Sequence, residues 1–168
     1  MPELKTLVLT EDQVLLKIQR IAWEIFERHV NEDVVYLVGI SKSGYWLAKQ
    51  IMTVLEEISD LKLILVEMEI NKKNPLDEDV HMNIKLHELE GKCVVLIDDV
   101  LNSGRVLIYG VRHLLGQPIK TLTTAVLVDR NHKKFPIKAD VKGLSLSTSI
   151  QEHVAVEIKG KKARVFLS

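Results

Sequence analysis

The sequence predicts an α/β fold in which helices flank a doubly wound, mostly parallel sheet. Three apolar runs, residues 34–40, 93–97 and 121–128, lack the alternation of a half-exposed strand. Strands buried on both faces of a parallel sheet have this composition. Segments with apolar residues at helical spacing lie between the runs, so we expect right-handed crossover helices to connect the strands.

The remaining elements follow from local signals along the chain. Thr10 and Gln13 form a capping-box pattern ahead of a helix predicted over residues 11–30, on which Trp23 is expected to be exposed. Further helices are predicted after residue 44, through residue 55, and over residues 105–115, the latter ending near Gly116. Additional strands are expected at residues 61–70, 140–144, 154–159 and 164–167.

Composition suits one domain spanning residues 1–168. Lys and Arg together number 23, as do Asp and Glu, so no overall field argues for a nucleic acid or a membrane partner. Residues 1–10 lack the apolar core of a signal peptide, and no apolar stretch is long enough to span a bilayer, so we expect a cytoplasmic protein. The single cysteine, Cys93, excludes an internal disulfide and is expected to be a buried, unreactive thiol.

The stretch that carries the chemistry is residues 93–106. Asp98 and Asp99 directly follow an apolar run, and a turn of small residues, 102–104, then opens the helix at Arg105. Backbone N–H groups and the dipole of that helix can hold a phosphate, while the two carboxylates can face diol hydroxyls or a hydrated Mg²⁺. The stretch therefore predicts a ligand that carries a phosphate, a diol and a metal-bound pyrophosphate.

Other polar turns also follow predicted strands. Residues 41–44 follow the first apolar run, and residues 129–132 follow the run at 121–128. In doubly wound sheets, ligands bind beyond the carboxyl ends of strands, where the strand order reverses, so these turns are expected to converge on one site. The polar, acidic segment at about residues 70–90 is predicted to be a flap over that site, and a disordered surface loop is the alternative.

Several blocks of the sequence resemble type I phosphoribosyltransferases. The segment IDDVLNSGR resembles the family's signature for phosphoribosyl diphosphate (PRPP), and LVGISKSGYWLAKQI resembles its pyrophosphate loop. The segment AVLVDRNHKKFPIKADVKGLSLSTS resembles the base-side region of one branch, the pyrimidine operon attenuators that are also uracil phosphoribosyltransferases. The blocks cover most of the chain in the family's order. The resemblance implies the family's fold, PRPP and a nucleobase (uracil first) as substrates, Mg²⁺ as cofactor, and a homodimer or higher oligomer.

The resemblance also implies a role for each matching residue. Asp98 and Asp99 would be the catalytic pair that binds the ribose hydroxyls, directly or through Mg²⁺. The 5′-phosphate would be held by Asn102, Ser103, Gly104 and Arg105, and the pyrophosphate by Ser41, Lys42, Ser43 and Gly44. The base would lie beside Asp129, Arg130, Phe135 and Ile137, and the flap would contribute Lys72 and Lys73.

Some residues depart from the family's pattern and keep a second function open. Val106 stands where the signature has a threonine, residues 42–44 lack the arginine of the attenuator's pyrophosphate loop, and Ile150 replaces a lysine. The first function is phosphoribosyl transfer to a base. The alternative is a non-catalytic regulator that senses PRPP or a nucleotide. One such regulator is an RNA-binding attenuator, which would contact RNA through basic side chains at residues 130–168 and on the first helix.

Two narrower alternatives complete the hypotheses. The run VVLIDDV also resembles the opening strand of a receiver domain, but too few residues follow Asp98 to complete one. Arg130 is expected either to lie at the base side or to form an ion pair with Asp129 or Asp140.

Overall fold

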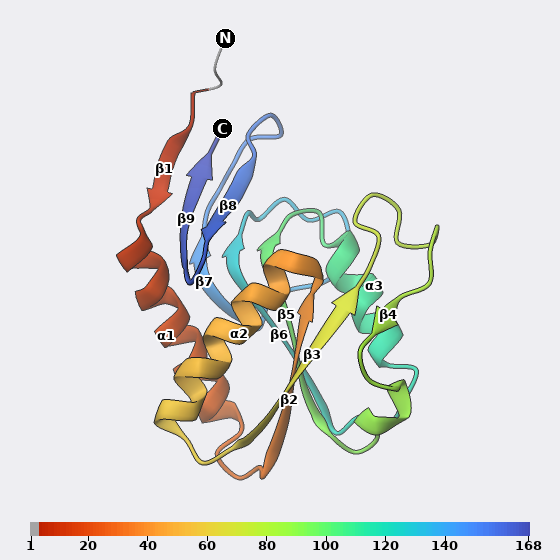
Figure 1. The fold of residues 1–168 in the computed structure, drawn as a ribbon. Coiled ribbons are helices and arrows are strands. Elements are labelled where there is room, and N and C mark those ends of the chain that lie inside the picture. The colour runs from red at the N-terminus through yellow and green to blue at the C-terminus, as the bar shows by residue number, and fades with distance from the viewer. Residues whose placement is uncertain (1–3) are drawn as a thin grey trace.

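The computed structural model describes residues 4–168, which form two sheets and three α-helices (Figure 1). The main sheet has six strands in the order β4-β3-β2-β5-β6-β7, and a smaller sheet has the order β1-β9-β8. The elements in chain order are β1 (Thr6–Leu9), α1 (Glu11–Arg28), β2 (Val34–Ile40), α2 (Ser41–Ile58), β3 (Lys62–Glu69), β4 (His81–Met82), the 3-10 helix η1 (Leu86–Leu89), β5 (Cys93–Leu101), α3 (Arg105–Leu114), β6 (Thr121–Asp129), β7 (Val141–Ser145), β8 (Val154–Lys159) and β9 (Lys162–Leu167).

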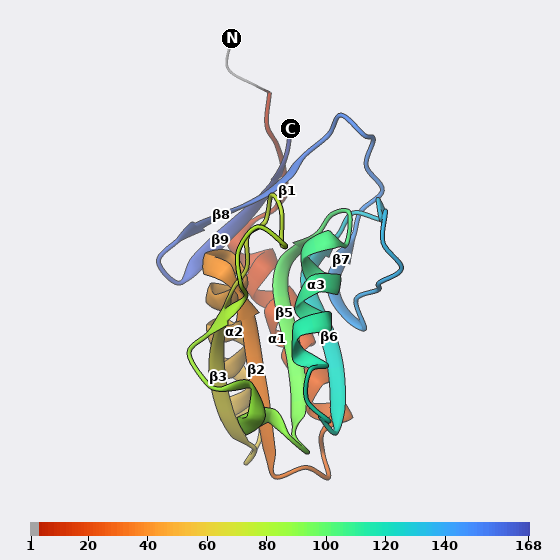
Figure 2. The same cartoon turned by 90° about the vertical axis from the view of Figure 1, so that its right-hand side faces the viewer.

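Five strands of the main sheet are parallel, and only the two-residue β4 runs antiparallel to its neighbour. Helices α1 and α2 cover one face of this sheet, and α3 covers the other (Figures 1 and 2). The predicted fold class, a doubly wound and mostly parallel sheet flanked by helices, is confirmed.

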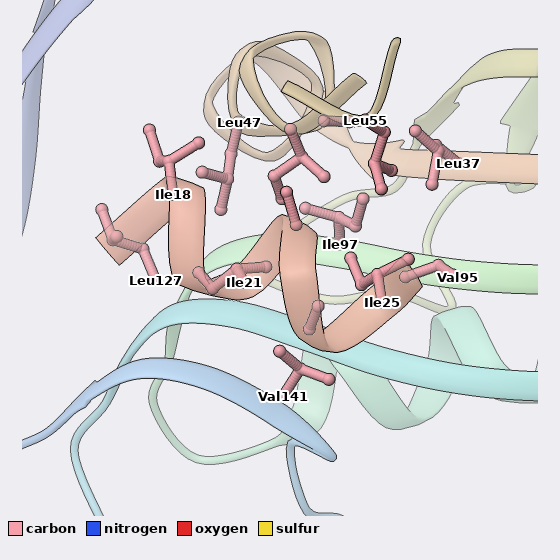
Figure 3. Close-up of a cluster of buried hydrophobic side chains, with 14 of the residues drawn as sticks. Ile18, Ile21, Ile25, Leu37, Leu47, Leu55, Val95, Ile97, Leu127 and Val141 are labelled. Atoms are coloured by element: carbon pink, nitrogen blue, oxygen red, sulfur yellow. The ribbon is translucent and has the colours of Figure 1, made fainter. Parts of the chain in front are cut away.

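The central strands lack apolar alternation because both of their faces are buried. In β2, Leu37 packs with α1 and α2, whereas the next residue, Val38, packs on the side of α3. Val95 and Leu96 of β5 divide in the same way (Figure 3 shows the α1 side). Each such side chain contributes about 1.5–3 kcal/mol by leaving water.

The strand order reverses between β2 and β5. The chain leaves β2 through α2 toward β3 on one side, and it leaves β5 through α3 toward β6 on the other. Neighbouring connections that diverge in this way open a crevice beyond the carboxyl ends of the two strands. The turns at residues 41–44 and 102–104 directly follow β2 and β5 and so lie at this crevice, whereas the turn at residues 129–132 follows β6.

The N-terminal region contains an element that the sequence did not predict. Strand β1 pairs antiparallel with β9, which begins at Lys162, two residues earlier than expected. The resulting small sheet lies beyond the carboxyl end of the main sheet (Figures 1 and 2). Its hairpin tip is held on α2, where Trp46 Nε1 donates to the Gly160 carbonyl at 2.8 Å.

The predicted flap has two different halves. Residues 71–80 are irregular and mostly exposed, but β4 then pairs with β3, and Leu89 of η1 is fully buried. Only the first half therefore projects over the strand ends.

Three further expectations concern single features of the chain. Cys93 is buried and free, and Trp23 is about half exposed. No helix of the described chain is both long and apolar enough to cross a membrane.

Candidate active site

Asp98 and Asp99 lie inside β5, which corrects the prediction that they follow the strand. Strand β5 extends to Leu101 because its ladder with β6 continues past the acids, pairing Asp98 with Val126 and Leu101 with Asp129. Asp98 is 5% exposed, and its Oδ1 accepts the backbone N–H of Asp99 at 2.9 Å. The carboxylates are thus held on sheet backbone rather than on a free turn.

One cation lies close to both acids. Lys72 Nζ, from the flap, is 3.7 Å from Asp98 Oδ1 and 3.9 Å from Asp99 Oδ1. Burial first, and the neighbouring Asp99 carboxylate second, raise the pKa of Asp98 well above its ordinary value, while Lys72 acts in the opposite direction. A carboxylate that is buried beside a like charge is a mark of a functional site.

The turn at residues 102–105, which the sequence predicts to hold a phosphate and which is called the phosphate turn below, is built around Gly104. This residue caps α3 with φ +86°, a conformation that side chains rarely adopt, and a Cβ there would lie 2.4 Å from Ile137 Cγ2. The Ser103 hydroxyl accepts the Arg105 backbone N–H at 3.3 Å. A cavity of about 210 Å³ opens beside the turn and brings together the acid pair, the predicted 5′-phosphate residues and one flap lysine: Asp98, Asp99, Asn102, Ser103, Gly104, Arg105 and Lys72.

The predicted turn at residues 41–44 is the first turn of α2, because the helix starts at Ser41 directly after β2. Ser41 itself has φ +50°, and such strain in a non-glycine residue often marks a functional site. Gly44 is buried against β5, where a Cβ would lie 2.7 Å from the Ile97 carbonyl and 3.1 Å from Asp98 Oδ1. The absence of a side chain at Gly44 thus lets the first turn of α2 pack against Asp98.

Ser41 and Lys42 line a second cavity, of about 240 Å³. Its other walls include Asn71 of the flap and acidic residues of β3 and the flap, namely Glu67, Glu69, Glu78 and Asp79. Asn71 is followed in the chain by Lys72, which lines the first cavity, so the flap contributes to both. The flap is also held to the phosphate turn, where Arg105 Nη1 donates to the Lys73 carbonyl at 3.4 Å.

The predicted base-side residues are not gathered in the first cavity. Asp129, 1% exposed, ends β6, and its Oδ2 makes no hydrogen bond but lies 3.5 Å from Lys142 Nζ. Phe135 and Ile137 pack on the outer side of Gly104. The loop that carries them is tied to the turn, because the backbone N–H groups of residues 134 and 135 donate to the Ser103 carbonyl at 2.8 and 3.1 Å.

Arg130 pairs with neither Asp129 nor Asp140. Its buried guanidinium donates to Asn102 Oδ1 at 3.1 Å and to Thr148 Oγ1 at 3.0 Å. It also donates to the carbonyls of Ser149 and Glu152. The side chain therefore connects the phosphate turn with the loop between β7 and β8.

The acid pair suits a Mg²⁺ ion that the substrate brings with it. The described residues contain no cluster of three or more His, Cys, Asp or Glu able to hold a metal ion by themselves. Asp98 and Asp99 nevertheless both line the first cavity. Mg²⁺ in proteins commonly binds one or two carboxylates, substrate phosphates and water, so the two acids fit a shared ion of this kind.

The sequence does not predict three contacts of the site, although the resemblance implies that Lys72 belongs to the flap. These are the approach of Lys72 to both acids, the packing of Gly44 on Asp98, and the bond from Arg130 to Asn102. Each joins segments far apart in the chain, so local pattern does not reveal it.

Comparisons with known proteins identify the family of the chain. The family model described as "Phosphoribosyl transferase domain" matches residues 7–160. The "Bifunctional protein PyrR" of Streptococcus pyogenes serotype M12 (strain MGAS2096) is 36% identical over 162 residues, covering 92% of this chain and 91% of the relative. The protein of the same name from Streptococcus thermophilus (strain ATCC BAA-491 / LMD-9) is 34% identical, covering 89% of this chain and 91% of the relative.

Solved structures share the fold at much lower identity. The hypoxanthine phosphoribosyltransferase of Trypanosoma cruzi superposes with a TM-score of 0.76 at 15% identity, covering 95% of both chains. A hypoxanthine-guanine phosphoribosyltransferase from Bacillus anthracis gives a TM-score of 0.69 at 18% identity, covering 85% of this chain and 84% of the other. The resemblance found in the sequence is confirmed, and the chain belongs to the phosphoribosyltransferase family.

Proposed function

We propose that this phosphoribosyltransferase transfers the phosphoribosyl group of PRPP to uracil at the crevice between β2 and β5. The observation that carries the proposal is the single cavity that joins the buried acid pair to the phosphate turn. A ligand with a diol and a phosphate at opposite ends of one sugar fits that combination. PRPP has both, and its pyrophosphate would extend toward the N-terminus of α2.

In the proposed reaction, the bond between C1′ and the pyrophosphate oxygen breaks as a base nitrogen forms a bond to C1′ and releases its proton. The transition state has oxocarbenium character, so it requires no nucleophilic side chain. Asp98 and Asp99 would hold the ribose hydroxyls, while residues 102–105 would hold the 5′-phosphate through backbone N–H groups. Lys72 and Lys73, on the flap, would exclude water and offset charge on the leaving group.

Mg²⁺ bound with PRPP would neutralise charge on the pyrophosphate. Ser41, Lys42, Ser43 and Gly44 are the proposed pyrophosphate contacts, supported by the position of Gly44 against Asp98. Asp129, Arg130, Phe135 and Ile137 remain proposed base-side residues. Their support is the loop that links the end of β6 to the phosphate turn.

An assay with Mg²⁺-PRPP and a panel of nucleobases tests the function. Formation of UMP and pyrophosphate from uracil, lost in Asp98→Asn/Asp99→Asn, is the expected result. If wild-type protein neither binds PRPP nor turns it over, the proposal is wrong. If the double variant binds PRPP with wild-type affinity, the assignment of the acid pair is wrong.

A regulatory function is the second candidate, favoured by the word "bifunctional" in the name of the relatives. We propose a role in pyrimidine metabolism, with RNA as a candidate partner. Several basic side chains that could contact RNA already interact within the protein. Arg20 donates to the carbonyls of residues 142 and 143, and Lys142 lies beside Asp129. A gel-shift titration with pyrimidine-operon leader RNA at several salt concentrations tests this role. A shift no stronger than with scrambled RNA would reject it.

We further propose that the protein is a cytoplasmic homodimer or higher oligomer. The buried, unpaired thiol of Cys93 is compatible with a reducing compartment. Light scattering coupled to size exclusion tests the assembly, where a monomer mass would reject it. Cell fractionation tests the location.

A further inference from the structure

We propose that Arg130 is a positioning residue that fixes the side-chain amide of Asn102 as a hydrogen-bond donor toward the phosphate group of the ligand. The inference rests on the proposed function, because it assigns a role within the same cavity. This role of the Arg130 guanidinium is separate from the proposed place of residue 130 on the base side.

The first step concerns which atom of Asn102 faces Arg130. A guanidinium only donates hydrogen bonds, so the atom 3.1 Å from Arg130 Nη1 must be the Asn102 carbonyl oxygen, Oδ1. The amide nitrogen of Asn102 then points away from Arg130. Because Asn102 is exposed and lines the 210 Å³ cavity, its two N–H groups are available to a ligand there.

The second step concerns why Arg130 can hold this orientation. Arg130 is 7% exposed, and its guanidinium donates to Thr148 Oγ1 at 3.0 Å, the Ser149 carbonyl at 3.2 Å and the Glu152 carbonyl at 2.5 Å. With Asn102, these bonds use four of its five N–H groups. Three of these bonds are independent of Asn102, so they hold the planar guanidinium in place and Asn102 must adapt to Arg130.

The third step concerns what the exposed N–H groups recognise. They sit on the turn next to Ser103 and Gly104, whose geometry suits an anion. Neutral N–H donors at this place favour phosphate oxygens, which accept hydrogen bonds and have no proton to donate. A carboxylate at position 102 would also accept the Arg130 bond, but it would repel the phosphate.

A binding cycle with Mg²⁺-PRPP, measured by isothermal titration calorimetry, tests the inference. Asn102→Ala is expected to weaken PRPP binding about tenfold through loss of the donor. Arg130→Lys should weaken binding about fivefold in the wild-type background, because a lysine cannot hold the amide and the three other acceptors together. In the Asn102→Ala background, Arg130→Lys should have no further effect.

Equal losses from Arg130→Lys in both backgrounds would overturn the positioning role, because the effect would not then pass through Asn102. Asn102→Asp provides a second arm that does not depend on how Arg130→Lys folds. It keeps the bond to Arg130, so its melting temperature should match or exceed that of wild type, yet PRPP should bind more weakly than to Asn102→Ala. Affinity equal to wild type in Asn102→Asp would overturn the donor role.

Two exposed residues give matched controls, Asn31→Ala in the turn before β2 and Arg112→Lys on α3, and both should bind PRPP as wild type does. In turnover, Asn102→Ala and Arg130→Lys should raise the KM for PRPP more than they lower kcat. A wild-type protein that binds no PRPP would overturn the proposed function and this inference together. If wild-type protein binds PRPP but the effects of Arg130→Lys and Asn102→Ala on binding are additive, only this inference is overturned.

Discussion

Replacing Asp98 by asparagine is expected to raise the free energy of unfolding at neutral pH while it abolishes PRPP binding. Burial and the Asp99 carboxylate raise the pKa of Asp98, so the ionised form is unfavourable in the folded protein. Asparagine has the same shape, and its oxygen can still accept the Asp99 backbone N–H. The substitution removes the unfavourable charge and keeps the hydrogen bond.

The size of this gain in the free energy of unfolding depends on how little positive charge lies beside Asp98. Lys72 is the cation beside it, at 3.7 Å, and it is shared with Asp99. Its side chain is 44% exposed, so solvent screening limits the attraction to about 1 kcal/mol or less. Burial of an incompletely compensated polar group costs about 1–3 kcal/mol. A net gain of about 1–2 kcal/mol is therefore expected, or roughly 2–8 °C in melting temperature.

The gain in the free energy of unfolding from Asp98→Asn should increase with pH. The folded-state pKa of Asp98 lies above its unfolded value, which is near 3.8. Protonated Asp98 therefore stabilises the wild-type fold below the unfolded pKa, and this stabilisation is lost as pH rises through the folded-state pKa. The difference between Asp98→Asn and wild type should be small at pH 4 and should grow toward pH 8. Urea denaturation at pH 4, 6 and 8 measures it.

Asp99→Asn is the matched control, because it removes a neighbouring charge from a side chain that is 18% exposed rather than 7% exposed. Asp99→Asn should raise the free energy of unfolding less than Asp98→Asn does, and it should weaken PRPP binding to a similar extent. The reasoning is refuted if Asp98→Asn unfolds more easily than wild type at pH 8, or if its gain is the same at every pH.

Three further substitutions probe the contacts around the acid pair. Gly44→Ala should lower stability by about 1–3 kcal/mol in urea denaturation and weaken PRPP binding, because its Cβ would meet the backbone carbonyl of Ile97 at 2.7 Å; wild-type stability would contradict the packing. Gly104→Ala should lower the free energy of unfolding by at least about 1–2 kcal/mol, because residue 104 has a φ of +86°. Adding Ile137→Ala to this variant should recover only the part of the loss that comes from the clash with Ile137, as thermal melts would show. Lys72→Met should raise the pKa of Asp98 further and so move the pH dependence of PRPP binding, followed by calorimetry, toward higher pH; an unchanged profile would show that Lys72 does not act on the acids.

Sequence pattern predicted the elements whose environment is uniform along their length. The strand expected at residues 34–40 has the bounds of β2, because every inward and outward position of a central strand is apolar. Strand β1 was missed because four residues become a strand only through pairing with β9, more than 150 positions away. The charged pair at residues 98 and 99 predicts too early an end for β5, because the ladder with β6 continues through both acids to Leu101.

Within the site, sequence predicted the residues that act through backbone geometry better than those that act through long side chains. Gly104 needs a left-handed conformation, and a glycine in a turn ahead of a helix signals this locally. Arg130 has carboxylates nearby in the sequence, which make an ion pair one of two expectations, yet none of its four hydrogen-bond acceptors is a carboxylate group. Its acceptors are neutral groups that the turn at Asn102 and the loop between β7 and β8 bring to it. These neutral partners satisfy its N–H groups, while a carboxylate that makes no hydrogen bond to it still lies within reach of its charge: the pKa of Glu152 is lowered first by the hydrogen bonds from Ser149 and also by Arg130.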